Sequence, residues 1–159
     1  MKKIQMVDLK SQYDKIKVAV NASIQDVLDT NTYINGPLVH QFQKNLETYL
    51  GVKHVIPCAN GTDALQIAMM ALDFKAGDEV IVPAFTYIAT VEVIALLGLI
   101  PKFIDVQEDT FELDHTQLEA LITDKTVGII PVHLFGRAAN MDEIMELAVA
   151  HNLYVIEDN

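Results

Sequence analysis

The sequence predicts an α/β protein in which N-terminal helices are followed by a largely parallel β sheet with flanking helices. Apolar residues make up 51% of the 159 residues, which is enough for a sizeable core. They recur at helical spacing through the segment 1–50. After Gly51, short apolar runs alternate with helical segments, and this alternation is typical of βαβ units with a parallel sheet.

Two helices are expected in the N-terminal helical segment, residues 1–50. The first carries a helical stripe formed by Ile16, Val20, Ile24, Val27 and Leu28. The second is expected to begin at Gly36-Pro37, because proline is favoured at the first helical position. Gly51 is expected to end this helix, because glycine commonly follows the last helical residue.

The rest of the chain, residues 51–159, is expected to form strands and helices in turn. Strands are expected at 54–58, 79–83, 101–106, 127–132 and 153–157, and helices at about 62–73, 86–98, 114–122 and 141–151. Two of these helices begin with a pattern similar to a capping box: Asp114 with Gln117, and Asn140 with Glu143.

Composition argues against several classes of protein. The net charge is −11, with 22 acidic against 11 basic residues, which disfavours nucleic acids and anionic membranes as partners. The N-terminus has no apolar signal-peptide region, and no apolar stretch approaches the length of a membrane span. Cys58 is the only cysteine, so a disulfide within the chain and a cysteine-based metal cluster are both excluded. We expect no metal site and a cytoplasmic location.

Polar and aromatic residues follow the predicted strands. In an open α/β sheet, ligands bind beyond the carboxyl ends of the strands, and parallel strands place these ends on one rim. The segments that would share this rim are Ala59–Asp63, Ala84–Tyr87, His133–Gly136 and Asp158–Asn159.

Each rim candidate has a binding and a structural interpretation. Gly61-Thr62 opens a helix, where backbone N–H groups and the helix dipole suit an anion, or it is a plain capped turn. Tyr87 or Phe85 stacks on a planar ligand or packs in the core. Asp158 ends a buried strand, where it either binds a cationic group or hydrogen-bonds a neighbouring loop.

Two further residues at strand ends favour a structural interpretation. His133 is either a base or ring contact, or a hydrogen-bonded structural histidine beside an apolar strand. Cys58 is expected to pack inertly at the end of a buried strand. The patterns GxGxxG and GxxxxGK[ST] are absent, so neither a dinucleotide site nor a P-loop is supported.

Taken together, the rim candidates describe a ligand with an anion at one end, a flat ring, and a cationic point. Pyridoxal 5'-phosphate (PLP) fits this description: its phosphate would lie at Gly61-Thr62, its ring on Tyr87 or Phe85, and its protonated ring nitrogen beside Asp158. A carboxylate favours the charged pyridinium, which the ring needs in order to act as an electron sink.

Four stretches of the sequence closely resemble the DegT/DnrJ/EryC1/StrS family of sugar aminotransferases, PLP-dependent enzymes of fold type I. They are GPLVHQFQKNLETYLGVKHVIPCANGTDALQIAMMAL, GDEVIVPAFTYIATVEVIALLG, IIPVHLFGRAANMDEIMELA and VIEDN. The resemblance runs from about Asp8 onward, in the family's order. It implies that residues 51–159 are the incomplete first half of the PLP-binding large domain.

The resemblance also implies roles for individual residues. Gly61 and Thr62 match the family's phosphate-binding helix start, Tyr87 the aromatic residue on the pyridine ring, and Asp158 the acid on its nitrogen. The family's Glu-Asp-x-Ala-Gln stretch is present only as far as Asn159. Its glutamine and the lysine that forms a Schiff base with the cofactor are expected beyond that residue, so no catalytic residue is expected within this chain.

Family membership implies a reaction and partners. Glutamate would donate an amino group that is passed to a keto-sugar carried on a nucleotide diphosphate, with C3 the expected position, and the amino sugar would feed surface polysaccharide. The complete protein is expected to be a homodimer. Two alternatives stay open: a PLP-dependent sugar dehydratase of the same family, which has histidine in place of the lysine, and a truncated, non-catalytic fragment.

Overall fold

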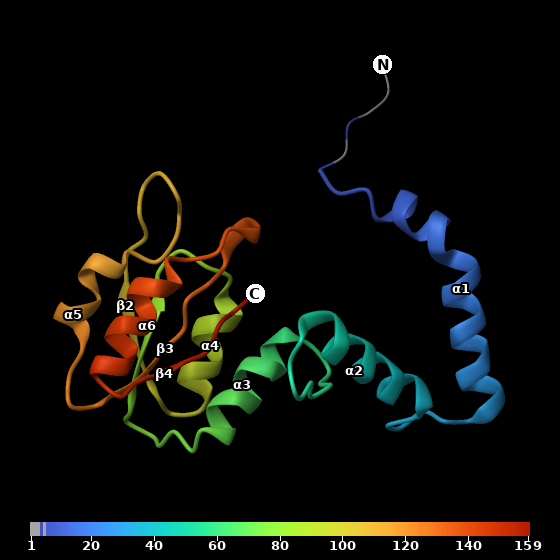
Figure 1. Cartoon of the computed structure of the whole chain (residues 1–159), viewed down its shortest axis with the longest axis horizontal. Helices are drawn as coiled ribbons and strands as arrows, with labels where there is room; N and C mark the ends of the chain where they lie inside the picture. The colour runs from blue at the N-terminus through green and yellow to red at the C-terminus, as the bar shows by residue number, and fades with distance from the viewer. Residues whose placement is uncertain (1–3, 5) are drawn as a thin grey trace. The chain divides into compact units, whose positions relative to one another are not determined.

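The computed structural model describes residues 4 and 6–159, and the chain separates into two compact units, Met1–Pro57 and Cys58–Asn159. The first unit contains helices α1 (Leu9–Thr30) and α2 (Pro37–Leu50) (Figure 1). Pro37 is the first residue of α2, and Gly51 ends it with a φ of 68°. Both helices and their predicted boundaries at Gly36-Pro37 and Gly51 are confirmed.

The second unit is built on a four-stranded, fully parallel sheet with the order β2-β1-β3-β4. Its strands are β1 (Glu79–Pro83), β2 (Ile100–Ile104), β3 (Thr126–Ile129) and β4 (Tyr154–Val155). The α/β class and the parallel sheet predicted from the sequence are therefore confirmed.

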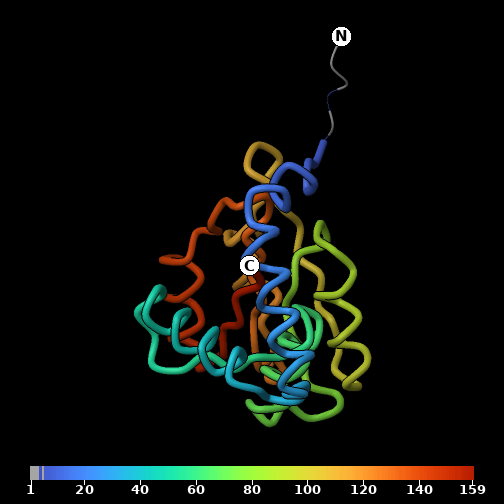
Figure 2. The backbone as a smooth tube through the Cα atoms, turned by 90° about the vertical axis from the view of Figure 1, so that its right-hand side faces the viewer, coloured from blue at the N-terminus to red at the C-terminus, as the bar shows by residue number. Residues whose placement is uncertain are grey.

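Helices cover both faces of this sheet, with alternate strand residues directed to opposite sides. Val80 and Val82 of β1 pack in one core with α3 (Gly61–Ala71) and α4 (Ile88–Leu96). Ile81 packs in a second core with α5 (Leu118–Leu121) and α6 (Met141–Ala150). Figure 2 shows the backbone of α4 and of α6 on opposite sides of the sheet.

The predicted strand at 54–58 is wrong. Residues 54–58 have no regular secondary structure, and the chain bends at Ala59 and Asn60. A strand forms only where a neighbour supplies hydrogen-bond partners, and no described residue pairs with this run; Pro57 also has no N–H to donate.

Consequently Cys58 does not end a buried strand. It is exposed, and its thiol donates to the backbone oxygen of Asn60 at 3.3 Å, which corrects the expectation of inert packing.

The two predicted capping boxes have different outcomes. Asp114 accepts a hydrogen bond from the N–H of Thr116 and another from the Gln117 side chain. The hydrogen bond donated by the Thr116 side chain is the main cause that lowers the pKa of Asp114. Asn140 lies at the start of α6 but makes no capping hydrogen bond through its side chain. The capping box predicted for Asn140 and Glu143 is therefore wrong.

We expect the 159-residue chain on its own to self-associate. No described strand pairs with the outer edges of β2 and β4, no residue of α1 or α2 is buried, and Leu96 and Val149 are 70% and 74% exposed. Unpaired strand edges and exposed apolar surface promote association. Sedimentation velocity over a range of concentrations should show species that grow with concentration. A monodisperse monomer with a cooperative thermal transition would contradict this expectation.

Candidate functional site

The strand order defines a ligand-binding position on the sheet. From β1 the chain passes to β2 on one side, and it then returns to β3 on the other side of β1. The topological switch point therefore lies between β1 and β3, where α/β sheets bind ligands beyond the carboxyl ends of the strands. We call this edge of the second unit the carboxyl rim, formed by the residues that follow β1, β3 and β4.

Asp158 is fixed on the carboxyl rim by its backbone. Its N–H donates to the oxygen of Pro131 at 3.0 Å, and its own oxygen accepts from the N–H of His133 at 2.9 Å. These bonds extend the pairing of β3 with β4, and Val132 and Asp158 form a parallel bridge. The position of Asp158 beyond the end of its strand agrees with the sequence prediction.

The side chain of Asp158 is tied to the first turn of α4. The hydroxyl of Thr90 donates to Asp158 Oδ2 at 2.5 Å, across 68 positions of sequence. Tyr87 caps the start of the same turn and is 76% exposed. The other aromatic candidate, Phe85, instead pairs with Phe111 at a centroid distance of 5.7 Å. The structure therefore brings Tyr87 and Asp158 to one place and leaves the Tyr87 ring accessible.

Gly61 and Thr62 form the first turn of α3. The cap residue Asn60 accepts from the N–H of Asp63 at 2.9 Å through its side chain and from that of Ala64 at 3.1 Å through its backbone. The N–H groups of Gly61 and Thr62 have no acceptor within the helix. A Cβ built on Gly61 would meet nothing within 4 Å, so this turn is open to an approaching group.

The direction of α3 places this turn toward the carboxyl rim. Leu65 and Met69 pack α3 against β1, and the helix ends before the turn that enters β1 at Glu79. A helix of this length spans about 16 Å, similar to the strand beside it. Its first residues therefore lie toward the carboxyl end of β1, the same edge as Tyr87 and Asp158.

His133 is a structural residue in this arrangement. Its side chain is 9% exposed, and Nδ1 accepts from the N–H of Ala139 at 3.1 Å. Because Nδ1 is an acceptor, the proton lies on Nε2, which donates to Glu157 Oε2 at 2.8 Å. Both ring nitrogens thus hold the loop after β3, and neither is directed to a ligand.

Thr90 was missed by the sequence analysis. It is 1% exposed and is the only hydroxyl residue buried in the apolar helix α4. A polar side chain at a buried helical position needs a partner, and this was the available signal. Its partner could not be read from the sequence, because the pairing depends on the three-dimensional register of β3 and β4.

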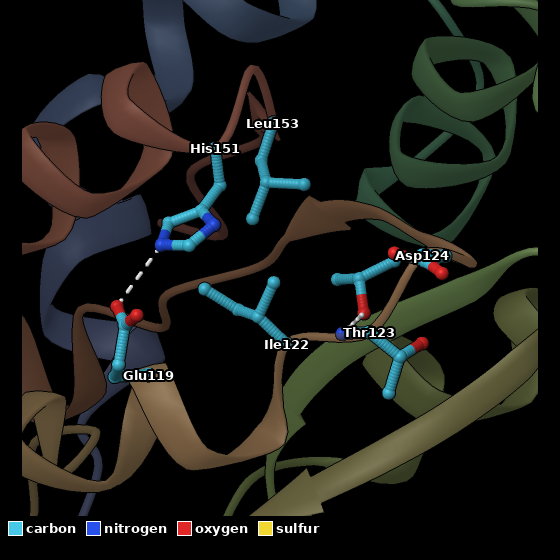
Figure 3. A pocket seen from close by; sticks show the side chains of 7 residues that line it. Glu119, Ile122, Thr123, Asp124, His151 and Leu153 are labelled. Carbon is cyan, nitrogen blue, oxygen red and sulfur yellow. Dashed lines mark hydrogen bonds and ion pairs between the residues drawn. The ribbon is translucent and has the colours of Figure 1, made fainter.

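A cavity of about 380 Å³ lies away from these residues, at the amino end of β3 (Figure 3). Figure 3 shows His151 and Glu119 at one side of the cavity, joined at 3.0 Å, with Thr123 and Asp124 at the other. These side chains belong to the edge opposite the carboxyl rim. Within the described ranges, no group of three or more acidic, histidine or cysteine side chains is arranged to hold a metal ion.

The carboxyl rim fits PLP. It offers two backbone donors for an anion at the start of α3, an exposed aromatic ring at Tyr87, and a carboxylate at Asp158. No described residue donates to Oδ1 of Asp158, and every buried polar atom of the described side chains has a hydrogen-bond partner. Oδ1 is therefore accessible to a cationic ring nitrogen.

This parallel sheet, with helices on both faces, has the fold of PLP-dependent aminotransferases of fold type I. Within that class, the chain belongs to the DegT/DnrJ/EryC1/StrS aminotransferase family, which matches residues 14–159. The resemblance noted in the sequence is confirmed.

Three relatives show the extent of the similarity. The UDP-2-acetamido-2-deoxy-3-oxo-D-glucuronate aminotransferase of Pseudomonas aeruginosa is 48% identical over 98% of this chain and 43% of its own length. Bacillus subtilis NtdA, solved with the cofactor PMP, has a TM-score of 0.92 and 36% identity over 99% of this chain and 37% of its own. Escherichia coli GDP-4-keto-6-deoxy-D-mannose-3-dehydratase, with hydrated PLP, has a TM-score of 0.80 and 32% identity over 87% of this chain and 37% of its own. The chain thus spans less than half the length of these proteins.

None of the helices that the structure describes combines the length and apolar character needed to cross a membrane.

Proposed function

We propose that this chain supplies the cofactor-binding part of a PLP-dependent aminotransferase. The enzyme transfers an amino group from glutamate to C3 of a nucleotide-linked keto-sugar, and the product feeds surface polysaccharide. One observation carries the proposal: the carboxylate of Asp158 is held at the carboxyl rim by the helix turn that bears the exposed Tyr87. Similarity to the Pseudomonas aeruginosa 3-oxo-sugar aminotransferase supports the substrate class and the position C3.

The rim residues have separate roles in this reaction. The N–H groups of Gly61 and Thr62 would hold the cofactor phosphate, assisted by the positive end of the α3 dipole. Tyr87 would support the ring, and the Asp158 carboxylate would hold the ring nitrogen in its protonated form. When bound, the cofactor supplies an electron sink for the reacting amino acid.

The lysine that carries the amino-transfer chemistry is expected beyond Asn159. The lysines of the second unit lie away from the carboxyl rim. Lys75 and Lys125 are in turns that lead into the amino ends of β1 and β3. Lys102 reaches back to Glu79, the first residue of β1, at 4.0 Å.

A homodimer with shared active sites agrees with the charge distribution of this chain. A nucleotide diphosphate needs cationic donors, and the chain has one arginine, Arg137, which is paired with the carboxylate of Glu112. We infer that the donors come from the downstream segment or from a second subunit. The single cysteine and the acidic composition fit an enzyme of the cytoplasm.

A sugar dehydratase of the same family is the second candidate, because the Escherichia coli dehydratase shares the fold and PLP. The residue at the downstream lysine position separates the two: lysine for the aminotransferase, histidine for the dehydratase. A truncated, non-catalytic fragment is the third candidate, and it predicts a protein that folds or pairs without turnover.

The test uses the complete enzyme, in which residues 1–159 are followed by the downstream segment that the relatives carry. It is supplied with PLP, glutamate and UDP-2-acetamido-2-deoxy-3-oxo-D-glucuronate. We expect 2-oxoglutarate and the 3-amino sugar in equal amounts. Loss of a sugar hydroxyl from a 4-keto-6-deoxy substrate, without amino transfer to any 3-oxo sugar, would establish the dehydratase instead.

Replacing Tyr87 should weaken cofactor binding by a modest factor. Stacked aromatic pairs contribute about 0.5–1.5 kcal/mol, so Tyr87→Ala should raise the Kd for PLP by roughly 2- to 12-fold. Tyr87→Phe keeps the ring and should stay close to wild type. Fluorescence titration of the complete apoenzyme measures this, with Phe85→Leu as a matched control, because Phe85 packs on Phe111. Equal weakening by Tyr87→Ala and Phe85→Leu would remove Tyr87 from the site.

A further inference from the structure

Thr90 has an unusual hydrogen-bonding arrangement for a helical threonine. Threonine in a helix commonly bonds the carbonyl oxygen one turn back. The Thr90 hydroxyl instead reaches out of α4 to Asp158 Oδ2 at 2.5 Å, although the residue is 1% exposed. Around it, α4 buries only apolar side chains: Ala89, Val93 and Ile94. A buried hydroxyl at this position is thus directed at one group, the Asp158 carboxylate.

The direction of each hydrogen bond follows from the chemistry of its partners. An ionised carboxylate only accepts, so the single hydroxyl proton of Thr90 is donated to Asp158. The Thr86 hydroxyl lies 3.4 Å from that of Thr90. Because the Thr90 proton is already used, Thr86 is the donor in this second contact. The result is an ordered series in which Thr86 donates to Thr90 and Thr90 donates to Asp158.

This series fixes which carboxylate oxygen faces outward. The backbone of Asp158 is held between Pro131 and His133 by the extended strand pairing. With Oδ2 bound to Thr90, rotation of the carboxylate is restricted, and Oδ1 is left without a donor among the described side chains. Thr90 is also three residues after Tyr87, so one helix turn sets both the exposed aromatic ring and the outward oxygen.

We propose that Thr90 is a positioning residue that orients Asp158 toward the cofactor ring nitrogen. This inference rests on the proposed function, because it concerns the same carboxyl rim. Thr90 does not touch the cofactor. It acts through Asp158, by keeping Oδ1 directed outward and in line with the ring that Tyr87 supports. Thr86 supports the orientation of the Thr90 hydroxyl.

The test compares Thr90→Val with Thr90→Ser in the complete enzyme. Valine has nearly the same shape as threonine but no hydroxyl, and hydrogen bonds to charged groups are worth about 1.5–3 kcal/mol. Thr90→Val should therefore lower kcat roughly 10- to 100-fold. Thr90→Ser keeps the donor and should recover most of the activity. Thr126→Val is the matched control, since Thr126 is 8% exposed and hydrogen-bonded at the opposite edge of the sheet.

A double-mutant cycle separates positioning from a purely structural role. If Thr90 acts through Asp158, Thr90→Val should change kcat by less than about 2-fold when Asp158 is already alanine, because the two losses are coupled. A structural role would lower kcat by the same factor in both backgrounds and would overturn the proposal. Thermal stability measured on the same samples identifies any variant whose folded fraction has fallen.

A spectroscopic readout does not depend on turnover. With PLP labelled with nitrogen-15 at the ring nitrogen, NMR reports whether that nitrogen is protonated. A misplaced Asp158 stabilises the pyridinium less, so the ring nitrogen of Thr90→Val should lose its proton at lower pH than in wild type, and Thr126→Val should not change it. If wild type and Asp158→Ala behave as the proposed function requires but Thr90→Val matches wild type, only this inference fails. A wild-type enzyme without transaminase activity would instead contradict the proposed function.

Discussion

Replacing Asp158 with alanine should lower kcat by at least about 100-fold in the complete enzyme, while the fold remains largely intact. Positioned electrostatic and acid–base groups typically contribute effects of this size. Without the carboxylate, the ring nitrogen of the cofactor loses its proton more readily, and a neutral pyridine is a weaker electron sink. Cofactor retention should change less, because phosphate binding at Gly61-Thr62 and stacking on Tyr87 are untouched.

The structure explains why stability should be less affected than turnover. The backbone N–H and oxygen of Asp158 keep their bonds to Pro131 and His133 whatever the side chain. The Thr90 hydroxyl loses its acceptor, but the Thr86 hydroxyl, 3.4 Å away, can take its place. Turnover and melting temperature should be measured on the same PLP-loaded sample. A variant that melts early yet retains wild-type turnover per folded molecule would show that Asp158 is structural.

The 159-residue chain alone should have no transaminase activity. Lys75 and Lys125 lie at the amino end of the sheet, and Lys102 is directed there by its contact with Glu79. The remaining lysines of the described chain, Lys10, Lys15, Lys17, Lys44 and Lys53, belong to the first unit. The second unit therefore offers the cofactor a carboxylate and donors on the carboxyl rim, but no amine close to it.

This prediction is checked by incubating the chain with PLP and glutamate and measuring pyridoxamine phosphate. We expect no formation above the rate without protein, whereas the complete enzyme should convert one equivalent per site. Fast, stoichiometric conversion by the short chain would show that one of its own lysines serves the reaction. It would also remove the need for a catalytic residue beyond Asn159.

Local sequence patterns predicted most of the fold. The helices α1 and α2 and four of the five expected strands follow from apolar spacing and from glycine and proline at the boundaries, which act within a few residues. The strand expected at 54–58 did not form, because its apolar run meets no pairing partner among the described residues. Apolar composition alone does not determine strand formation, since pairing depends on distant parts of the chain.

The sequence also predicted part of the candidate site, but not all of it. Tyr87 and Asp158 were identified as candidates because they follow predicted strands, and the parallel order of the sheet places such residues on one rim. Thr90 was not found, because its bond to Asp158 joins positions 68 residues apart. That contact depends on the register that continues β3 and β4 to Val132 and Asp158. Which side chains contact one another at the carboxyl rim therefore depends on the assembled sheet and cannot be predicted from local sequence patterns.

A crystal structure of the complete enzyme with bound PLP tests the central claim most directly. The account predicts the ring nitrogen within hydrogen-bond distance of Asp158 Oδ1, with Oδ2 still bound to Thr90. It also predicts the ring against Tyr87 and the phosphate at the N–H groups of Gly61 and Thr62. A cofactor bound elsewhere, or one whose ring nitrogen faces a group other than Asp158, would contradict the assignment of the carboxyl rim as the PLP site.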